Sequence, residues 1–294
     1  DDTISGRKAQ RKGDRTLKIQ AQRERAGIFS QMHKKKGMFV IPNAWDAASA
    51  YIFEREGFEA VATTSAGIAY SLGYCDGQEI TIDDLEYAVG KMADRISVPL
   101  SVDVERGYGE TGRQVKENIR RLLRAGASGF NLEDGQSDGA LSPVELQIEK
   151  IRAIAELKEE TGIDFVINAR TCAYWLDVAG EEEKFEIACQ RGNAFAQAGA
   201  DCVFVPGAIG EETVKKLAEN IEAPLNIILN GKFNDLKKLE KAGVRRLSTG
   251  SGPARYIYGN TVEIARELRC GKTEQILSGW LSYNEANEYF KDQI

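Results

Sequence analysis

Histidine is almost absent from this chain of 294 residues, which carries a single one, His33. A catalytic or metal centre built on several imidazoles is therefore excluded, and with it most zinc-dependent chemistry. Cysteine is sparse as well, because five residues are scattered along the chain and none forms a Cys-x-x-Cys pair. Such an odd, scattered set favours reduced thiols in a cytoplasmic compartment over a disulfide framework.

Long apolar runs and an excess of positive charge are also missing. No stretch approaches the roughly 18 apolar residues of a membrane span, and no signal-peptide core follows the N-terminus. Acidic residues outnumber basic ones by 45 to 39, and this net charge of −6 argues against a nucleic-acid partner. Many basic residues gather in residues 1–36, which we interpret as a solvated, largely helical or frayed segment. A targeting remnant is the alternative for that segment.

The sequence does contain eight short apolar runs, separated by amphipathic stretches of helix length. Near-continuous apolar runs are typical of strands that are buried on both faces of a parallel sheet. Small residues such as Ala-Gly-Ala close several helical stretches just before the next strand. The expected strands are Met38–Pro42, Ala60–Ser65, Pro99–Val104, Gly129–Leu132, Asp164–Ala169, Asp201–Val205, Leu225–Leu229 and Arg245–Ser248.

This alternation predicts a (β/α)8 TIM-type barrel over residues 37–260. A doubly wound open sheet is the alternative, but a Gly-x-Gly-x-x-Gly fingerprint is missing after the first strand. Ser142 followed by Pro143 predicts the cap and first position of one helix. Residues 261–294 are expected to form an additional C-terminal helical segment. Its apolar side chains need their own barrel or a neighbouring subunit to cover them; they are Ile276, Leu277, Trp280, Leu281, Tyr283, Tyr289 and Phe290.

Carboxylates follow two neighbouring strands of the expected barrel. Asp103 and Glu105 come at the end of the third strand, and Glu133 comes at the end of the fourth. Asp76, in the loop after the second strand, can reach the same place. Because strand ends of a barrel face one common site, these four carboxylates should converge and repel unless a cation lies among them. Hard oxygen ligands of this kind suit Mg²⁺.

Other strand ends carry groups suited to an anionic substrate. Arg170 offers a planar fork for a carboxylate or phosphonate, although a structural ion pair is the alternative. The segment from Thr64 to Gly67 offers backbone N–H groups to an anion, or is only a tight turn. We interpret Cys172 as a buried, inert thiol.

In combination and order, the motifs resemble those of the isocitrate lyase and phosphoenolpyruvate mutase superfamily, from about Phe39 to about Gly252. They are Asn43-Ala44-Trp45-Asp46-Ala47, Thr64-Ser65-Ala66-Gly67, Leu72-Gly73-Tyr74-Cys75-Asp76-Gly77, Val102-Asp103-Val104-Glu105-x-Gly107-Tyr108-Gly109, Asn131-Leu132-Glu133-Asp134, Asn168-Ala169-Arg170-Thr171, Ala198-Gly199-Ala200-Asp201 with Val205-Pro206, and Gly243-Val244-Arg245-Arg246. The resemblance implies an α/β barrel, a homo-oligomer (dimer or tetramer) with a swapped C-terminal helix, Mg²⁺ with Mn²⁺ as a substitute, and a small oxo acid as the partner molecule.

The resemblance also implies roles for individual residues. Asp103 corresponds to the direct metal ligand, and Asp76, Glu105 and Glu133 to the outer carboxylates that hold its waters. Substrate-binding positions are implied for Trp45, Thr64, Ser65, Ala66, Asp103 and Arg170. Catalytic positions are implied for Arg170, Asp76 and Glu105.

Departures from the family pattern concern the group that completes the reaction. Family lyases carry an acid/base cysteine in the loop after the fourth strand, but here the loop Gly135–Leu141 has no Cys, Lys or His. The usual Arg-Thr-Asp ends in Cys172 here, and the lyase glutamate after the sixth strand is replaced near Pro206. Asp138, Tyr74, Tyr108 or a metal-bound water must then move the proton.

The sequence is therefore interpreted as that of a Mg²⁺-dependent lyase. It would cleave a carbon–carbon bond of a 2-hydroxy or 2-oxo dicarboxylic acid through a pyruvate-like enolate. One alternative keeps the same site and acts on a P–C bond, as phosphoenolpyruvate mutase or phosphonopyruvate hydrolase types do. Another is a non-catalytic protein that binds an oxo acid.

Overall fold

The computed structural model describes residues 19–279 and 281–291. Within this part of the chain there are two compact units, one that runs through Gly250 and one that begins at Ser251. Residues 1–18, which hold much of the basic N-terminal segment, lie outside the described residues. No described helix is both long enough and apolar enough to cross a bilayer.

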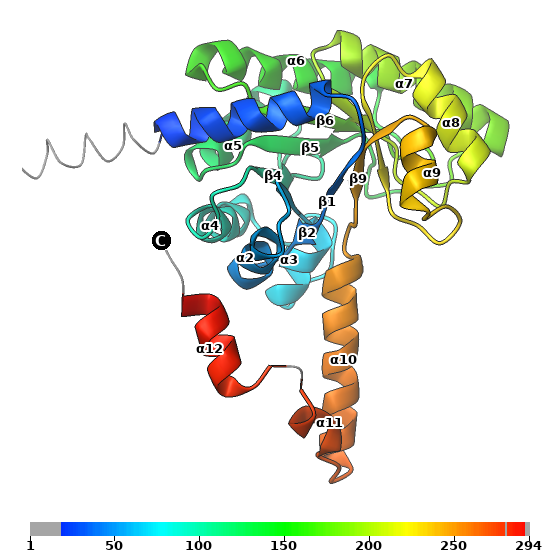
Figure 1. Ribbon diagram of the computed structural model, residues 1–294. Helices are drawn as coiled ribbons and strands as arrows, with labels where there is room; N and C mark the ends of the chain where they lie inside the picture. Colours follow the sequence, from blue (N-terminus) through cyan, green and yellow to red (C-terminus); the bar gives the residue numbers. More distant parts are fainter. Residues whose placement is uncertain (1–18, 280, 292–294) are drawn as a thin grey trace, which may run out of the picture. The chain divides into compact units, whose positions relative to one another are not determined.

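The first unit is built on one parallel sheet, with its strands at the centre of Figure 1. Every pairing between neighbouring strands is parallel, in the order β1-β9-β8-β7-β6-β5-β4-β3-β2. The strands are β1 (Phe39–Ile41), β2 (Asn43–Ala44), β3 (Val61–Thr63), β4 (Leu100–Asp103), β5 (Gly129–Glu133), β6 (Val166–Arg170), β7 (Cys202–Phe204), β8 (Leu225–Ile228) and β9 (Val244–Ser248). The eight predicted strands and the TIM-type fold are thus confirmed.

The sheet closes through its first strand, which Pro42 divides into β1 and β2. Strand β1 pairs with β9 on one side, and β2 pairs with β3 on the other. Proline has no N–H to give to a ladder, so the strand is interrupted at this residue. The Asn43 side chain holds the closure: its amide donates to the Thr63 carbonyl at 2.7 Å. Its Oδ1 accepts from the backbone N–H groups of Thr249 and Gly250, both at 2.9 Å.

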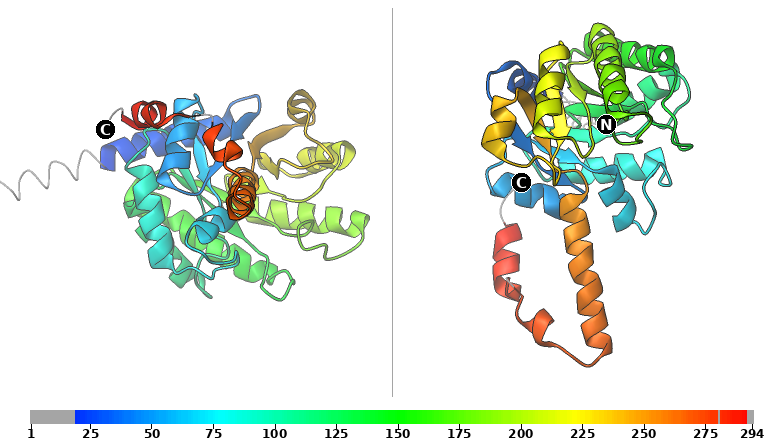
Figure 2. Two further views of the ribbon diagram at one scale, coloured as in Figure 1. Left: turned by 90° about the horizontal axis from the view of Figure 1, so that it is seen from below. Right: turned by 90° about the vertical axis from the view of Figure 1, so that its right-hand side faces the viewer.

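Helices surround these strands, as the two views of Figure 2 show. They bury apolar stripes against the strands, and the largest core cluster includes Val102, Ile119, Phe130 and Ile154. The helices are residues 19–34, α2 (Ala47–Arg55), α3 (Ser65–Ser71), α4 (Ile82–Ala93), α5 (Gly112–Arg124), α6 (Val144–Thr161), α7 (Glu181–Gln197), α8 (Glu211–Asn220) and α9 (Leu236–Lys241). One expectation was wrong: α6 begins at Val144, Pro143 takes the cap position, and no side chain caps this helix.

The interior of the barrel contains a polar layer as well as an apolar core. Arg246 is fully buried, and its Nη2 lies 3.1 Å from Ser101 Oγ and 3.2 Å from Asn131 Oδ1. Asn168 bridges Asn131 and Asn226, with 2.8 Å to each side-chain oxygen. Burial lowers the pKa of Arg246 to about 10. These bonds link strands β4, β5, β6, β8 and β9 across the barrel.

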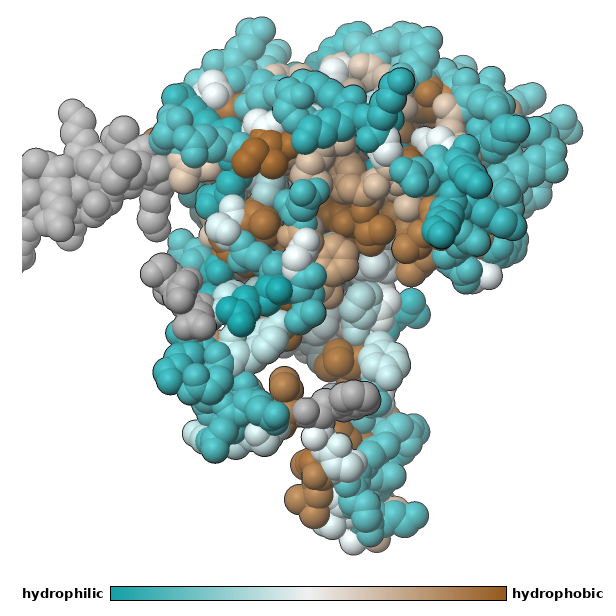
Figure 3. Space-filling view, viewed as in Figure 1, coloured by the Kyte–Doolittle hydropathy of each residue, from teal (hydrophilic) through white to brown (hydrophobic). Residues whose placement is uncertain are grey.

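The second unit consists of α10 (Gly252–Arg269), α11 (Glu274–Leu277) and α12 (Tyr283–Lys291). In α10 only Ala254 is buried. Figure 3 shows apolar side chains on the surface of this unit, and its exposed apolar residues include Ile276, Leu277 and Leu281. Trp280, which was counted with this apolar tail, lies outside the described residues.

Candidate active site

Four carboxylates meet at the carboxyl ends of β4 and β5 and in the loop after α3. Asp103 ends β4 and Glu133 ends β5, while Glu105 follows two residues after Asp103. Burial raises the pKa of Glu105 to about 8, and the charges of Asp103, Asp76 and Glu133 add to this effect. The four side chains are thus near enough for their charges to act on one another, at the end of the barrel where the sequence predicts them.

Asp103 is held in place by the end of the neighbouring strand β3. Its backbone N–H donates to Thr63 Oγ1 at 2.9 Å. Its Oδ2 lies 3.0 Å from Ser65 Oγ and 3.4 Å from the Ser65 backbone nitrogen. The segment from Thr64 to Gly67 is the first turn of α3, capped by the Thr64 side chain, which accepts from the Gly67 N–H. Ser65 is thus directed at Asp103, and Ala66 is buried beside it.

Asp76 lies at the rim of the cluster, in an exposed loop. Burial of its carboxyl group and the charge of Asp103 raise its pKa, and a hydrogen bond with Ser65 opposes this rise. Ser65 therefore touches both Asp76 and Asp103. Trp45, directly after β2 at the same end of the barrel, is half-buried against the core.

Arg170 lies at the end of β6 and pairs with the cluster. Its Nη1 is 2.8 Å from Glu133 Oε2, and both side chains are largely buried. Burial lowers the pKa of Arg170, but Glu133 and the other groups around the guanidinium together outweigh burial, and the pKa is raised. The guanidinium also stacks over Trp175 at 5.4 Å and over Phe204 at 5.8 Å. Its orientation is therefore fixed before any ligand arrives.

The residues present suit a divalent cation. Arg170 pairs with one of the four carboxylates, so the cluster keeps an excess of negative charge that a cation would neutralise. Among the described residues, no three acidic, histidine or cysteine side chains are placed to ligate one ion together. The set implied by the resemblance needs only Asp103 to touch the ion directly, with water between the ion and the other three.

Tyr108, one of the residues expected to move the proton, contacts the carboxylate cluster. Its hydroxyl donates to Glu105 Oε1 at 3.2 Å. Both residues have a left-handed backbone, with φ of 49° at Glu105 and 54° at Tyr108. Gly107 between them is required, because a Cβ there would lie 2.6 Å from Val115 Cγ1. Non-glycine residues in this region store strain, which gathers at functional sites.

The other candidates for proton transfer are placed less favourably. The loop Gly135–Leu141 folds back on itself, and the Gln136 N–H donates to the Ala140 carbonyl at 2.8 Å. Asp138 is engaged within this turn, where its Oδ1 accepts from the Ala140 N–H at 3.0 Å. Tyr74 is 54% exposed. Tyr108 is the candidate that contacts the carboxylate cluster directly.

Asp134 and Cys172 belong to the support of the site. Asp134 is buried, and its two oxygens accept from the Cys172 N–H at 2.7 Å and from Arg191 Nη1 at 3.0 Å. The Cys172 thiol is buried and lies 3.8 Å from Glu133 Oε2. Burial raises its pKa, so the thiol is protonated at neutral pH. Arg191 was not expected, because one arginine on a long, charged helix gives no signal in the sequence.

Comparisons with known proteins show which proteins this chain resembles. The family model described as phosphoenolpyruvate phosphomutase matches residues 29–269. The uncharacterised protein Rv1998c of Mycobacterium tuberculosis is 33% identical over 225 residues, which are 76% of this chain and 82% of that protein. The 2-methylisocitrate lyase of Escherichia coli is 31% identical over 201 residues, 65% of each chain. A solved structure from Burkholderia cenocepacia J2315 is 29% identical with a TM-score of 0.86, covering 93% of this chain and 98% of that one.

Proposed function

Because the chain belongs to the phosphoenolpyruvate phosphomutase family and is similar to lyases as well, we propose that it is a Mg²⁺-dependent carbon–carbon lyase. Its substrate is a 2-hydroxy or 2-oxo dicarboxylic acid, and the reaction passes through a pyruvate-like enolate. The observation that carries the proposal is the cluster of Asp76, Asp103, Glu105 and Glu133 with Arg170 fixed beside it. The similarity to a 2-methylisocitrate lyase supports the choice of a carbon–carbon bond.

Mg²⁺, or Mn²⁺ in its place, would supply a Lewis acid that stabilises the negative charge of an enolate oxygen. Asp103 would hold the ion directly, and the other three carboxylates would orient its waters. Ser65 positions Asp103 through the 3.0 Å contact between Ser65 Oγ and Asp103 Oδ2. The first turn of α3, with Thr64 and Ala66, would face one substrate carboxylate. Trp45, at the same end of the barrel, would also contact the substrate.

Arg170 would bind the second anionic group of the substrate. Trp175 and Phe204 flank its guanidinium, and Glu133 pairs with one of its nitrogens. Its Nε is buried and has no hydrogen-bond partner among the described residues. A ligand carboxylate would accept hydrogen bonds from this guanidinium, and the Arg170 side chain would not have to change its orientation to donate them.

Tyr108 is proposed as the residue that moves the proton, in place of the cysteine that family lyases carry in the loop after the fourth strand. Cleavage requires that the substrate loses a proton and that the carbon left behind gains one. Burial raises the pKa of Tyr108, so its hydroxyl is protonated, and it donates to Glu105 in the cluster. Tyr108 would take the substrate hydroxyl proton while passing its own proton to Glu105, and the reverse transfer would protonate the enolate carbon. We expect Tyr108→Phe to lower kcat by about 100-fold or more, which is the range of acid–base catalysis. Cation affinity, measured by calorimetry, should stay within a factor of about three, and a normal kcat in the folded variant would reject this role.

Steady-state turnover tests the proposal and its alternatives. The protein would be assayed with 2-methylisocitrate and related hydroxy diacids, and with phosphonopyruvate, each with and without Mg²⁺. Turnover of a diacid that stops when the metal is chelated supports the lyase. Turnover of phosphonopyruvate alone would indicate P–C chemistry, which the matching family model makes the second candidate. Saturable binding of pyruvate or oxalate without turnover of any compound would indicate a non-catalytic binding protein.

A further inference from the structure

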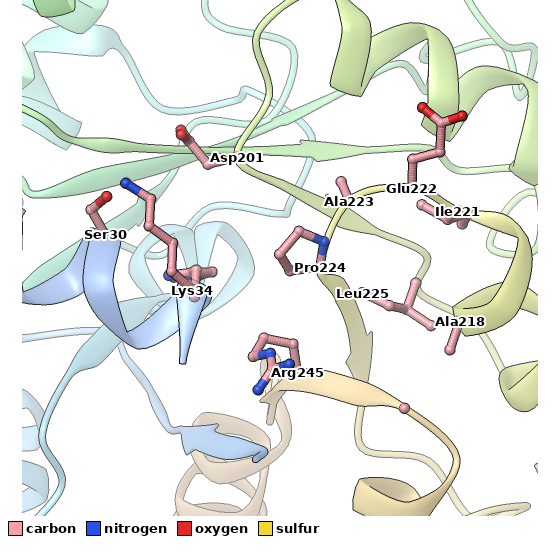
Figure 4. A pocket seen from close by; sticks show the side chains of 12 residues that line it. Ser30, Lys34, Asp201, Ala218, Ile221, Glu222, Ala223, Pro224, Leu225 and Arg245 are labelled. Carbon is pink, nitrogen blue, oxygen red and sulfur yellow. The ribbon is translucent and has the colours of Figure 1, made fainter. Parts of the chain in front are cut away.

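A cavity lies at the opposite end of the barrel from the carboxylate cluster. It has a volume of about 610 Å³. It lies beside the end of the helix formed by residues 19–34, and its lining includes residues that come just before β7 and β8 or at the start of β9. Because all strands are parallel, the amino ends of these strands face away from the site already described. Figure 4 shows this cavity from close by.

Buried polar atoms without a hydrogen-bond partner line this cavity. Ser30 and His33 are each 2% exposed, and Ser30 Oγ and His33 Nε2 have no partner among the described residues. Arg245 Nε is also buried and has no hydrogen-bond partner among the described residues. Native proteins rarely leave such atoms unsatisfied, because each costs about 1–3 kcal/mol. The cavity is therefore prepared for a polar occupant.

His33 can only accept a hydrogen bond from that occupant. Its Nδ1 lies 2.8 Å from the Phe29 carbonyl oxygen, so Nδ1 carries the proton and Nε2 carries a lone pair. Burial and the nearby charge of Arg246 lower the pKa of His33 to about 3, and the ring is neutral at pH 7. The matching group on a ligand is a donor, such as a hydroxyl.

The charge of the cavity favours an anion. Lys34 and Arg245 approach it from different elements, as Figure 4 shows. The Asp201 carboxylate is already neutralised: Lys158 Nζ lies 2.8 and 2.7 Å from its two oxygens, and the Ile167 N–H donates to it at 2.7 Å. Glu222 is exposed, and Figure 4 shows its carboxylate directed away from both cations. Lys34 Nζ lies 3.8 Å from Asp164 Oδ2, where both side chains are more than half exposed, and Arg245 Nη1 donates to the Gly37 carbonyl. A ligand carboxylate would replace the exposed Lys34–Asp164 contact and bind the buried Nε of Arg245.

An apolar wall completes the cavity. Pro224 and Leu225 form this wall in Figure 4. We propose that the cavity binds a small hydroxy acid, whose carboxylate lies between Lys34 and Arg245 and whose hydroxyl donates to His33 Nε2. Its carbon chain rests on Pro224 and Leu225. This site is separate from the cluster of Asp76, Asp103, Glu105 and Glu133, and it does not depend on the proposed lyase activity.

The single histidine makes a direct test possible. Full-length protein labelled with ¹⁵N-histidine would be titrated with L-malate at pH 7 without divalent cation, while the ring nitrogens are followed by NMR. We expect a saturable shift of His33 Nε2, because its lone pair becomes hydrogen-bonded. Arg245→Gln and, separately, Lys34→Gln should weaken the response at least tenfold. Arg113→Gln, at an exposed position of α5, should leave it unchanged.

Two controls keep this site apart from the proposed active site. Asp103→Asn should leave the response of His33 to malate as it is in the parent protein. Succinate, which lacks the hydroxyl, should bind at least tenfold more weakly than malate. The proposal is overturned if malate gives no saturable shift of His33, if Arg245→Gln responds like the parent, or if succinate binds as tightly as malate.

Discussion

At the scale of single residues, the carboxylate cluster carries the strongest prediction. Asp103 is the charge with the largest effect on Glu105, whose pKa stands at about 8. Removing one negative charge from a crowded set relieves repulsion in the cation-free protein. We therefore expect Asp103→Asn to abolish Mg²⁺-dependent turnover, while the free energy of unfolding without metal stays within about 1 kcal/mol of the parent or rises.

Calorimetric titration with Mg²⁺ and urea unfolding in chelator would check both parts. Asp83→Asn, on an exposed side chain of α4, is the matched control and should bind Mg²⁺ like the parent. Parent affinity for Mg²⁺ in Asp103→Asn would contradict the assignment of Asp103 as the direct ligand.

The thiols near the site are expected to be dispensable. Cys172 lies 3.8 Å from Glu133, but burial raises its pKa and keeps it protonated, and Cys75 is exposed. Cys172→Ser and Cys75→Ser should each keep turnover within about tenfold, or roughly 1.4 kcal/mol of barrier. A loss of three orders of magnitude in folded Cys75→Ser, seen in kcat, would place the acid/base in the loop after α3.

At the scale of elements, the eight strands followed from apolar runs, because both faces of these strands are buried. The sequence did not distinguish the start of helix α3 from a tight turn, because Thr64-Ser65-Ala66-Gly67 is short and rich in small residues. The expectation that Asp103, Glu105 and Glu133 come together followed from the order of two strands, and that for Asp76 followed from the reach of its loop. The contacts of Tyr108 with Glu105 and of Arg191 with Asp134 did not, because they depend on left-handed backbone and on helix rotation.

The helix of residues 19–34 gives a prediction for pH dependence. His33 has a pKa of about 3 in the folded protein and about 6.5 when unfolded. Between these values only the unfolded chain binds the proton, so the stability from its neutral burial is complete above pH 6.5 and is lost as pH falls toward 3. The loss is about 1.4 kcal/mol per pH unit, or about 2 kcal/mol at pH 5.

The variant His33→Phe isolates this contribution. It keeps a ring beside Phe29 and Phe39, which contact His33 edge-on at 4.7 and 5.0 Å, and it shares every other titrating group with the parent. Chemical unfolding at pH 7 and pH 5 should show the parent losing about 2 kcal/mol more than the variant. An equal loss in both proteins would show that His33 is not buried in its neutral form.

At the scale of the whole molecule, the second unit predicts self-association. Leu277 is 81% exposed and Leu281 is 55% exposed, and apolar surface of this kind calls for a neighbour. Removing residues from Thr273 onward should lower the oligomeric state measured by light scattering. Leu277→Asp combined with Leu281→Asp should do the same, and Lys272→Asp should not. An unchanged mass for the truncated chain would reject this interface.

The hydrogen bonds that join Asn43 to the end of the last strand also have a consequence for folding during synthesis. The partners of Asn43, Thr249 and Gly250, lie 206 and 207 positions later. While the protein is being synthesised, the early strand β1 has no neighbour on its outer side until β9 has left the ribosome. Nascent chains that stop before this point expose an open strand edge, which invites pairing with other chains. Release of the last strand, rather than assembly of the carboxylate site, is then the step that protects the chain from aggregation.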